Sequence, residues 1–418
     1  MKPTVTDETN GYSFAWPEHN ISINASRIQV HRSDGHVSGE IFVQAKNGQG
    51  NYITIYPPTS YNFSADRTRK ELSKSLSVKN PELDWSEIVD QLCFGVQERA
   101  RKGEAVIELS TLGDIKPPEY ILYPLIVKNY PNVIFGDPSS SKSTIAVILS
   151  QVVMLPWHDN PMGLVAPRKP VRVLYLDWET DADTIQWQTT MLQRSIEEAE
   201  ILFLNYRQCS QPLANDTEQI KLHIRDTKSD LIIIDSLGLA TGGELKETQP
   251  ALGFYAALRS LKTTSLILAH NSKDRESKTR SIYGNQFFSA QSRNIWEVRK
   301  NQDADSSELD IALFHRKPPP FSGLHKPLGF KIVFDNKDGI MNIHQSDPKD
   351  VGEFIEQMGW KERIKDALKD GPMTNKELCK ELSTNSANIA VNLTRLSKAS
   401  IVSKQDDKWV LNEAILLC

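Results

Sequence analysis

The sequence contains no run of eighteen apolar residues, and its first residues show no basic segment that leads into an apolar stretch. A membrane-spanning helix needs the first pattern and a secretory signal needs the second. We therefore expect a protein of the cytoplasm that makes no contact with a membrane. The four cysteines lie without CxxC pairing or histidines at a suitable spacing, which argues against both a zinc site and a disulfide framework.

A strong charge of either sign is also missing, since the formal net charge is −4. Any affinity for a phosphate backbone must then come from local basic patches. Apolar residues make up 39% and charged residues 24% of the chain, which is typical of a folded globular protein. At 418 residues the chain exceeds what one hydrophobic core usually serves, so we expect two or three domains.

The first part of the chain, residues 1–115, has the pattern of an α+β module. Residues 12–58 alternate apolar and polar side chains between turn sequences, as the strands of hairpins do. Helical spacing of apolar residues follows from Ala65 to Lys102. No motif in this module indicates its role.

Residues 118–334 have the pattern of an α/β domain. Near-continuous apolar runs alternate with helical segments there, and such runs are typical of strands that are buried on both faces of a mostly parallel sheet. The expected strands are NVIFG, VRVLYLD, ILFLN, LIIIDS, SLILAH, IALFH and FKIVFD. Residues 335–355 are polar and lack strong periodicity, which suits a linker.

The end of the chain, residues 356–418, predicts three short amphipathic helices and then two strands around a charged turn. Thr374 with Glu377 fits a capping box at the start of the second helix, and Ser383 or Thr384 is the candidate cap of the third. Three helices followed by a β-wing are the winged-helix pattern.

The strongest local signal is a loop between the strand NVIF and an apolar helix. It consists of Gly136, Asp137, Pro138, Ser139, Ser140, Ser141, Lys142, Ser143 and Thr144. In a phosphate loop the backbone N–H groups cradle the phosphates of ATP, the lysine neutralises the β- and γ-phosphates, and the following hydroxyl, here that of Ser143, coordinates Mg²⁺. A Ser-rich turn that binds no nucleotide is the alternative.

One position departs from the usual phosphate loop, because Ser141 stands where glycine normally precedes the lysine. A Cβ atom there is expected to crowd the phosphates or to restrict the loop. A loop that binds ATP but hydrolyses it slowly is therefore a second interpretation.

Two carboxylates follow strands of the same α/β unit. LIIIDS places Asp235 at the tip of a buried strand, where its carboxylate is expected to hold a water of the Mg²⁺ shell. Glu179 lies just past the strand VLYLD, between the phosphate loop and Asp235 in the sequence.

This order of elements resembles the RecA-like ATPases, in particular the hexameric replicative helicases of plasmids and phages, over about residues 118–334. The resemblance implies that Glu179 orients the attacking water, with Asp177 as its neighbouring competitor. It also implies that His270 or Asn271, at the end of a strand, senses the γ-phosphate.

The resemblance further assigns roles to basic residues. The polar loop after SLILAH corresponds to the loop that faces nucleic acid in the channel of RecA-like rings, although a solvated surface loop would have the same composition. Its basic residues are Lys273, Arg275, Lys278 and Arg280. Arg316 and Lys317 resemble the paired basic residues that family members insert into the neighbouring subunit's nucleotide site, which makes hydrolysis depend on assembly.

In the C-terminal module the segment SANIAVNLTRL is the candidate recognition helix, with Arg395 as its basic residue. Such helices enter the major groove of DNA, while basic residues on the wing, here Lys404 and Lys408, touch phosphates. Many winged helices bind proteins instead, and Asp406 and Asp407 on the wing keep that alternative open.

These features together predict an α/β chain with a RecA-like P-loop core, preceded by the α+β module and followed by the winged helix. We expect it to bind ATP and Mg²⁺, to form a homo-oligomeric ring or filament, and to act on nucleic acid, with DNA preferred, as a helicase or translocase. The alternative is an ATP-gated accessory or defence-system switch without sustained unwinding. A metabolic kinase would share the loop but needs a substrate-hydroxyl site and a lid, which the sequence does not show.

Overall fold

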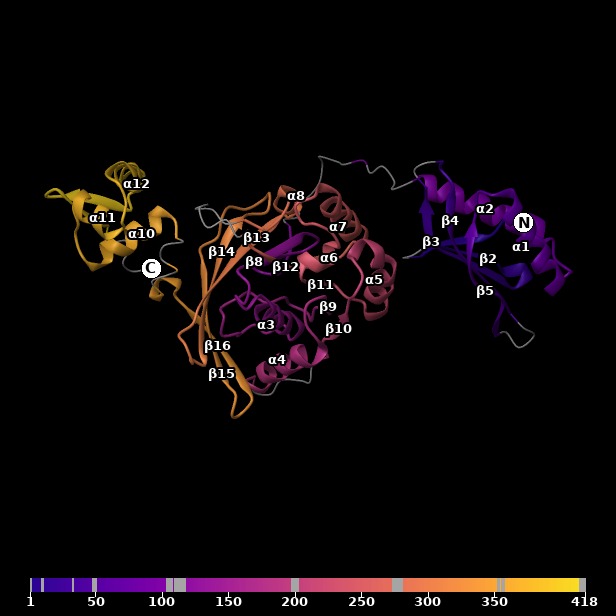
Figure 1. Ribbon diagram of the computed structural model, residues 1–418, viewed down its shortest axis with the longest axis horizontal. Helices are drawn as coiled ribbons and strands as arrows, with labels where there is room; N and C mark the ends of the chain where they lie inside the picture. Colours follow the sequence, from indigo (N-terminus) through magenta and orange to yellow (C-terminus); the bar gives the residue numbers. More distant parts are fainter. Residues whose placement is uncertain are drawn as a thin grey trace. The chain divides into compact units, whose positions relative to one another are not determined.

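The computed structural model describes residues 2–8, 11–31, 34–46, 51–102, 108, 118–196, 203–272, 281–351, 354 and 358–412. The chain divides into two compact units, one made of residues 1–117 with 215–228 and the other of residues 118–214 with 229–418. Figure 1 labels their helices and strands. Among the described residues, no helix combines the length and the apolarity that a membrane span requires.

The first unit contains a five-stranded antiparallel sheet in which each strand pairs with the next along the chain. Its strands are β1 (Thr4–Glu8), β2 (Gly11–Trp16), β3 (Ile21–Val30), β4 (Val37–Lys46) and β5 (Tyr52–Asn62), and its helices are α1 (Asp66–Lys79) and α2 (Trp85–Lys102). Alternate strand residues such as Phe14 and Ile23 share one core with Leu76 and Leu92 of the helices. The sheet and the helices are those predicted, whereas β1 was missed.

The second unit is built on a nine-stranded sheet in the order β10-β9-β11-β12-β8-β13-β14-β15-β16. The pairs from β10 to β13 are parallel and the remaining three pairs are antiparallel. The strands are β8 (Pro131–Gly136), β9 (Val173–Asp177), β10 (Asn205–Gln208), β11 (Leu231–Asp235), β12 (Thr264–His270), β13 (Asn294–Asn301), β14 (Glu308–Lys317), β15 (Leu328–Asp335) and β16 (Ile340–Ser346). The predicted α/β fold with a mostly parallel sheet is confirmed.

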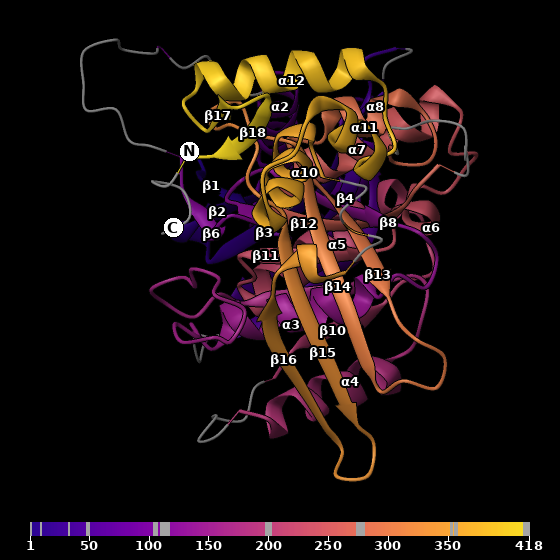
Figure 2. The same ribbon diagram turned by 90° about the vertical axis from the view of Figure 1, so that its left-hand side faces the viewer.

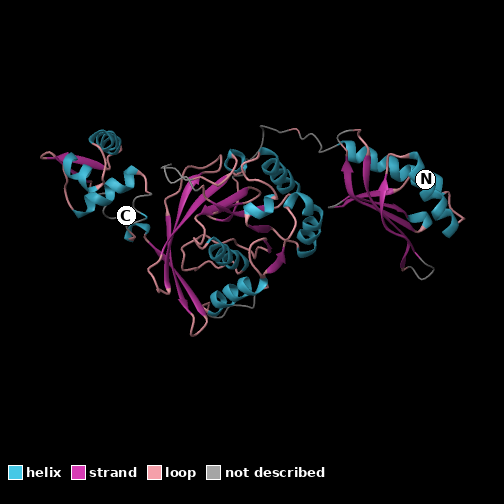
Figure 3. Ribbon diagram, viewed as in Figure 1, coloured by secondary structure: helices cyan, strands magenta, loops and turns pink. Residues whose placement is uncertain are grey.

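The central strands are apolar throughout because helices cover both of their faces. Ile134, Ile233 and Leu268 point to the side where they share a core with α3 and α4. Their neighbours along the same strands, such as Val133 and Ile267, point to the other side and are equally buried. Figures 1 and 3 show α3 and α4 on one side of the sheet and α6 and α7 on the other. The helices are α3 (Lys142–Met154), α4 (Ala182–Arg194), α6 (Leu237–Thr241), α7 (Thr248–Ser260) and α8 (Gln286–Gln291), and a short pair, β6 (Tyr120–Leu122) and β7 (Ile126–Val127), precedes β8. Most of α5 (Leu213–Thr227) falls in residues 215–228, which belong to the first unit.

The antiparallel end of this sheet bends back toward α4. That helix contacts β10 at one edge of the sheet and β16 at the other, so the sheet curves around α3 and α4. Figure 2 shows β14, β15 and β16 side by side as the long strands of this extension. The curve encloses α3, the helix that begins at Lys142.

Two expectations about strands were wrong. ILFLN does not form the strand expected there, because β10 starts only at Asn205; Phe203 is 83% exposed, and residues 201–202 lie outside the described residues. Residues 335–355 are not a linker throughout, because β16 pairs with β15 and completes the sheet. Both strands lie at sheet edges, where half-exposed positions accept polar side chains and weaken the apolar pattern.

The C-terminal module has three helices and a hairpin, in the order that the sequence predicted. They are α10 (Trp360–Ala367), α11 (Asn375–Glu381), α12 (Ser386–Lys398), β17 (Val402–Gln405) and β18 (Lys408–Leu411). The capping box of Thr374 and Glu377 at α11 is confirmed. The expected cap of α12 was wrong, because the Asn385 side chain, and not Ser383 or Thr384, accepts the bond from the Asn388 N–H.

We predict that Asn385→Ala loosens the start of α12. Loss of an N-cap side chain costs about 1 kcal/mol, so amide hydrogen exchange in the first turn of the helix should become about fivefold faster. Thr384→Ala is the matched control and should leave these exchange rates unchanged. Faster exchange in the control alone would show that the helix begins one residue earlier.

Candidate functional site

Four neighbouring parallel strands end at one edge of the sheet and bring the predicted site residues together. In the register Asp235 lies opposite Asp177, and His270 lies opposite Gly136. Since the carboxyl ends of parallel strands point the same way, the loops after β8, β9, β11 and β12 all open on this edge. Ligands of open α/β sheets bind at such an edge.

The loop from Gly136 to Lys142 has the geometry of a cradle. A Cβ on Gly136 would lie 2.6 Å from the Val298 carbonyl oxygen and 2.7 Å from the Ser140 Oγ, so only glycine fits there. Ser139 and Ser141 both have φ of 61°, in the left-handed region that glycine occupies at no steric cost. The restriction expected at Ser141 is therefore a backbone conformation that disfavours any residue with a side chain.

Within the described part of the chain, the Ser140 Oγ is buried and has no hydrogen-bond partner. An unpaired buried hydroxyl in a loop that a Cβ would fill fits a site whose polar partner is a phosphate oxygen. The loop residues thus fit a nucleotide phosphate.

Lys142, the first residue of α3, turns its side chain back over this loop. Its Nζ donates to the carbonyl oxygens of Asp137 at 2.8 Å and Gly136 at 3.4 Å. Burial lowers the pKa of the Lys142 ammonium, and the charges of Glu179 and Asp235 oppose that change. The lysine therefore faces both predicted carboxylates.

Asp235 lies at the end of β11 and is almost fully buried. Its Oδ2 accepts a hydrogen bond from the Tyr175 hydroxyl at 2.7 Å. Burial raises the pKa of the Asp235 carboxyl, while the hydrogen bonds with Ser143 and Tyr175 lower it. Ser143 and Asp235, the two predicted magnesium-site residues, are thus in direct contact, and a hydroxyl beside a carboxylate is a donor set that suits Mg²⁺.

Asp177 and Glu179, the two candidate carboxylates, have different surroundings. The Asp177 carboxylate is fully buried and accepts from the backbone N–H groups of Glu179 at 2.8 Å and Thr180 at 2.9 Å, from the Thr180 hydroxyl at 2.7 Å and from the Tyr206 hydroxyl at 3.1 Å. It holds the turn after β9. The Glu179 side chain, 31% exposed, is the carboxylate that remains open to the site.

Glu179 is in turn oriented by residues from two other strands. Its Oε1 accepts from the Ser236 hydroxyl and lies 3.3 Å from the Nε2 of His270. The hydrogen bond from His270, followed by that from Ser236, holds the pKa of the Glu179 carboxyl below its usual value against the effect of burial. The contacts that orient Glu179 thus also favour its ionised form.

Asn271 connects the end of β12 to the phosphate loop. Its backbone N–H donates to the Gly136 carbonyl oxygen at 3.1 Å, and its amide nitrogen donates to the Asp137 Oδ1 at 2.7 Å. Of the two residues proposed to sense the γ-phosphate, His270 contacts Glu179 and Asn271 contacts the loop. The end of β12 thus touches both parts of the site.

Arg316 and Lys317 lie away from this edge, and both already have partners. The Arg316 Nη2 lies 2.5 Å from the Oε2 of Glu297, which is 1% exposed, and Arg299 pairs with the other oxygen. The Lys317 Nζ donates to the carbonyl oxygens of Ser289, Ala290 and Ser292, at and just past the end of α8. Lys317 therefore caps α8, which competes with the role expected for it.

The expected nucleic-acid residues fall in two places. Lys273, Arg275, Lys278 and Arg280 lie outside the described residues. Arg395 is exposed near the end of α12. In the hairpin of β17 and β18, Lys404 pairs with Asp407 at 2.5 Å, which lowers the positive charge available there.

Sequence reasoning missed two members of the site, Ser236 and Tyr175. Ser236 follows Asp235 directly, so the motif LIIIDS already contained it. Tyr175 precedes Asp177 by two residues, and it is the polar side chain among the four residues of β9 that come before Asp177, which is a usable signal. Their contacts, however, join β9 to β11, and no local pattern shows such pairs.

A comparison with models of protein families agrees with the P-loop interpretation. A family model described as "AAA domain" matches residues 98–276, a segment that contains the phosphate loop, Glu179, Asp235 and His270. The search of curated proteins gives no match. A solved structure of a KaiC-like protein from the archaeon Pyrococcus horikoshii OT3 is similar at 12% identity and a TM-score of 0.36, over 54% of this chain and 94% of that one. The family match and the arrangement of the site support a P-loop ATPase.

We predict that Ser141→Gly keeps ATP binding and raises ATP turnover, because it removes the cost of a left-handed non-glycine residue, roughly 1 kcal/mol, beside the phosphates. Ser139→Gly, which relieves the same conformation farther from Lys142, is the matched control and should change turnover less. Affinity for ATP and the turnover number are measured for both. Loss of ATP binding in Ser141→Gly would show that the serine itself holds the nucleotide.

Proposed function

We propose that this chain is an ATP-hydrolysing subunit of a homo-oligomeric motor that acts on nucleic acid, with DNA as the preferred partner. The observation that carries the proposal is the meeting of Lys142, Asp235, Glu179 and His270 at one sheet edge. A lysine, a buried acid with a hydroxyl and an oriented free carboxylate are what phosphoryl transfer to water requires.

Each residue then has a distinct task. The backbone of the loop and Lys142 hold the β- and γ-phosphates. To do so, the Lys142 ammonium gives up its hydrogen bonds to the loop carbonyl oxygens and donates to phosphate oxygens instead. Ser143 and Asp235 would hold Mg²⁺, which supplies positive charge to the transferring phosphoryl group. Glu179 accepts a hydrogen bond from the attacking water and orients it, while Ser236 and His270 keep the carboxylate in place.

We predict that Glu179→Gln binds ATP but turns it over roughly 10²–10⁴-fold more slowly, because the amide cannot accept the proton of the water. Asp177→Asn should lose far less turnover, since an amide oxygen can still accept from the backbone of the turn. Lys142→Ala should lose ATP binding with the fold intact. A large fall in Asp177→Asn combined with normal turnover in Glu179→Gln would show that the wrong carboxylate was chosen.

The proposed action on nucleic acid has support from chain connectivity. The loop with the four basic residues directly follows His270 and Asn271, which contact Glu179 and the phosphate loop. A change at His270 or Asn271 on the loss of a phosphate would therefore pass along the chain to these four residues, and so to a bound strand. The C-terminal module offers exposed Arg395 on α12 as a second contact to a phosphate backbone, in the arrangement of a winged helix.

A second candidate function is favoured by the left-handed conformation of Ser141. A phosphate loop under this constraint suits slow hydrolysis, as in an ATP-gated accessory or defence-system switch. In that case ATP controls assembly without sustained unwinding. Strand displacement, measured beside ATP turnover with single-stranded DNA, double-stranded DNA and RNA, distinguishes the switch from the motor.

We predict that hydrolysis depends on a residue from the neighbouring subunit, with Arg316 as the candidate. Arg316→Ala should lower turnover, and mixing it with Glu179→Gln subunits should restore part of the activity, because some interfaces then combine an intact Glu179 with an intact Arg316. Arginine fingers contribute roughly 10³–10⁵ in rate, so the restored activity should exceed the background of either variant alone. Turnover of each mixture is measured against protein concentration.

Arg299→Ala is the matched control, because Arg299 pairs with the same buried Glu297. If Arg316 only neutralises Glu297, the two variants should behave alike. Equal losses, or full activity per subunit in a monomer, would contradict the trans-acting role and favour a self-contained switch.

A further inference from the structure

A pocket of about 500 Å³ opens at the amino ends of β8, β12 and β13, opposite to the edge with the phosphate loop. Its walls come from the segment that enters β8, from α7 with the turn into β12, and from the turn into β13. Pro131, which lines the pocket, and Gly136 are the two ends of β8, and the five steps between them correspond to about 17 Å of strand. The pocket is therefore distinct from the proposed ATP site.

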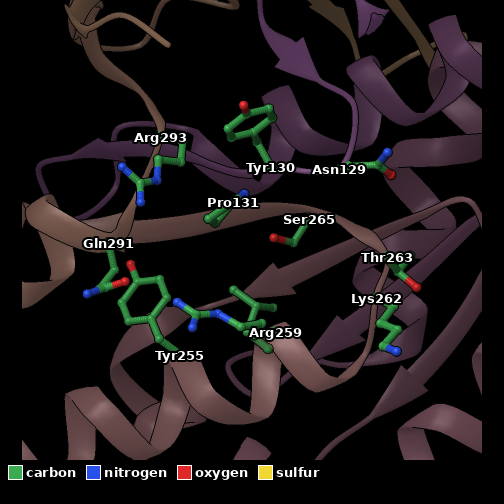
Figure 4. A pocket seen from close by; sticks show the side chains of 11 residues that line it. Asn129, Tyr130, Pro131, Tyr255, Arg259, Lys262, Thr263, Ser265, Gln291 and Arg293 are labelled. Carbon is green, nitrogen blue, oxygen red and sulfur yellow. The ribbon is translucent and has the colours of Figure 1, made fainter. Parts of the chain in front are cut away.

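The charged residues in the wall of this pocket are all cations, Arg259, Lys262 and Arg293. Within the described residues, no carboxylate forms an ion pair with the guanidinium of Arg259 or Arg293. Figure 4 shows Arg259 and Arg293 on the same side of the pocket as Gln291, and Lys262 on the other side. The charge of these two guanidinium groups is thus not neutralised by a carboxylate of the described residues.

Ser265 lies between these groups in Figure 4, and its hydroxyl is an independent sign of a ligand. The side chain is buried, and among the described residues its Oγ has no hydrogen-bond partner. A buried hydroxyl without a partner costs free energy, so it is expected where a bound molecule supplies one. Thr263, Gln291 and Tyr130 add neutral polar groups and an aromatic ring to the same wall.

We propose that this pocket binds a phosphate-bearing small molecule, up to the size of a mononucleotide. Guanidinium groups bind phosphate through paired N–H donors, and two of them from different elements define a place for a dianion. The volume lies in the range of small-molecule sites, which leaves room for more than the phosphate itself. The Ser265 hydroxyl and the neutral polar groups then contact the phosphate or the organic part of the ligand.

The test is calorimetric titration of the full chain in phosphate-free buffer, saturated with Mg²⁺ and ADP so that the phosphate loop is occupied. AMP, inorganic pyrophosphate and adenosine are the probes. We expect AMP or pyrophosphate to bind once per chain and adenosine to bind at least tenfold more weakly. Tighter binding of AMP than of pyrophosphate assigns a nucleotide-like ligand, and the reverse order assigns a bare phosphate compound; either supports the proposal.

Arg259→Ala/Arg293→Ala should weaken that binding roughly tenfold or more and leave ADP binding unchanged. Arg168→Ala/Lys169→Ala removes the same charge from an exposed turn of the same unit and should have no effect. Ser265→Ala should weaken binding without lowering the thermal stability of the unliganded protein, because its hydroxyl has no partner to lose. If Ser265 had only a structural role, its replacement would lower ligand binding and thermal stability together.

Three results would overturn the proposal. The first is the absence of AMP and pyrophosphate binding to the ADP-saturated protein, and the second is binding that the double arginine variant leaves unchanged. The third is tighter binding of an eight-residue deoxythymidine oligonucleotide that the same variant abolishes, which would assign a nucleic-acid surface instead. Because Lys142→Ala removes only the ATP site, AMP binding in that variant tests this pocket even if the proposed ATPase function fails.

Discussion

The hydrogen-bonded register between β9, β11, β12 and β8 is the constraint on which the whole site depends. It sets Asp235 beside Asp177 and His270 beside Gly136 through backbone bonds alone, before any side chain makes a contact. A slip of one residue would turn every one of these side chains to the other face. Helices on both faces exclude water from the strands, so this register is also the most costly part of the fold to change.

Burial of the acids at this edge costs free energy, which their hydrogen bonds offset. Asp177 is surrounded by donors of its own turn, and Asp235 by the hydroxyls of Ser143 and Tyr175. Glu179 differs because its donors, Ser236 and His270, arrive from other strands and leave part of the carboxylate exposed. The same chemical group thus serves as a structural anchor in one place and as a candidate reacting group two residues later.

Much of this site could be predicted from the sequence because strands buried on both faces leave continuous apolar runs. Those runs located the ends of β8, β9, β11 and β12, and hence the residues that follow them. Strand β13 escaped prediction because Glu297 and Arg299 interrupt its apolar pattern, although their charges pair in the folded chain. Lys317 was assigned a role in a neighbouring subunit because its contacts with the end of α8 exist only in three dimensions.

The enclosure of α3 has a mechanical consequence. Eleven of its thirteen residues are buried, so a shift of this helix would open voids in a close-packed core. The loop that leads into α3 is therefore attached to a rigid helix. A change of shape on the loss of a phosphate is therefore expected to start outside α3, at Glu179 and His270, whose side chains contact each other and remain partly exposed.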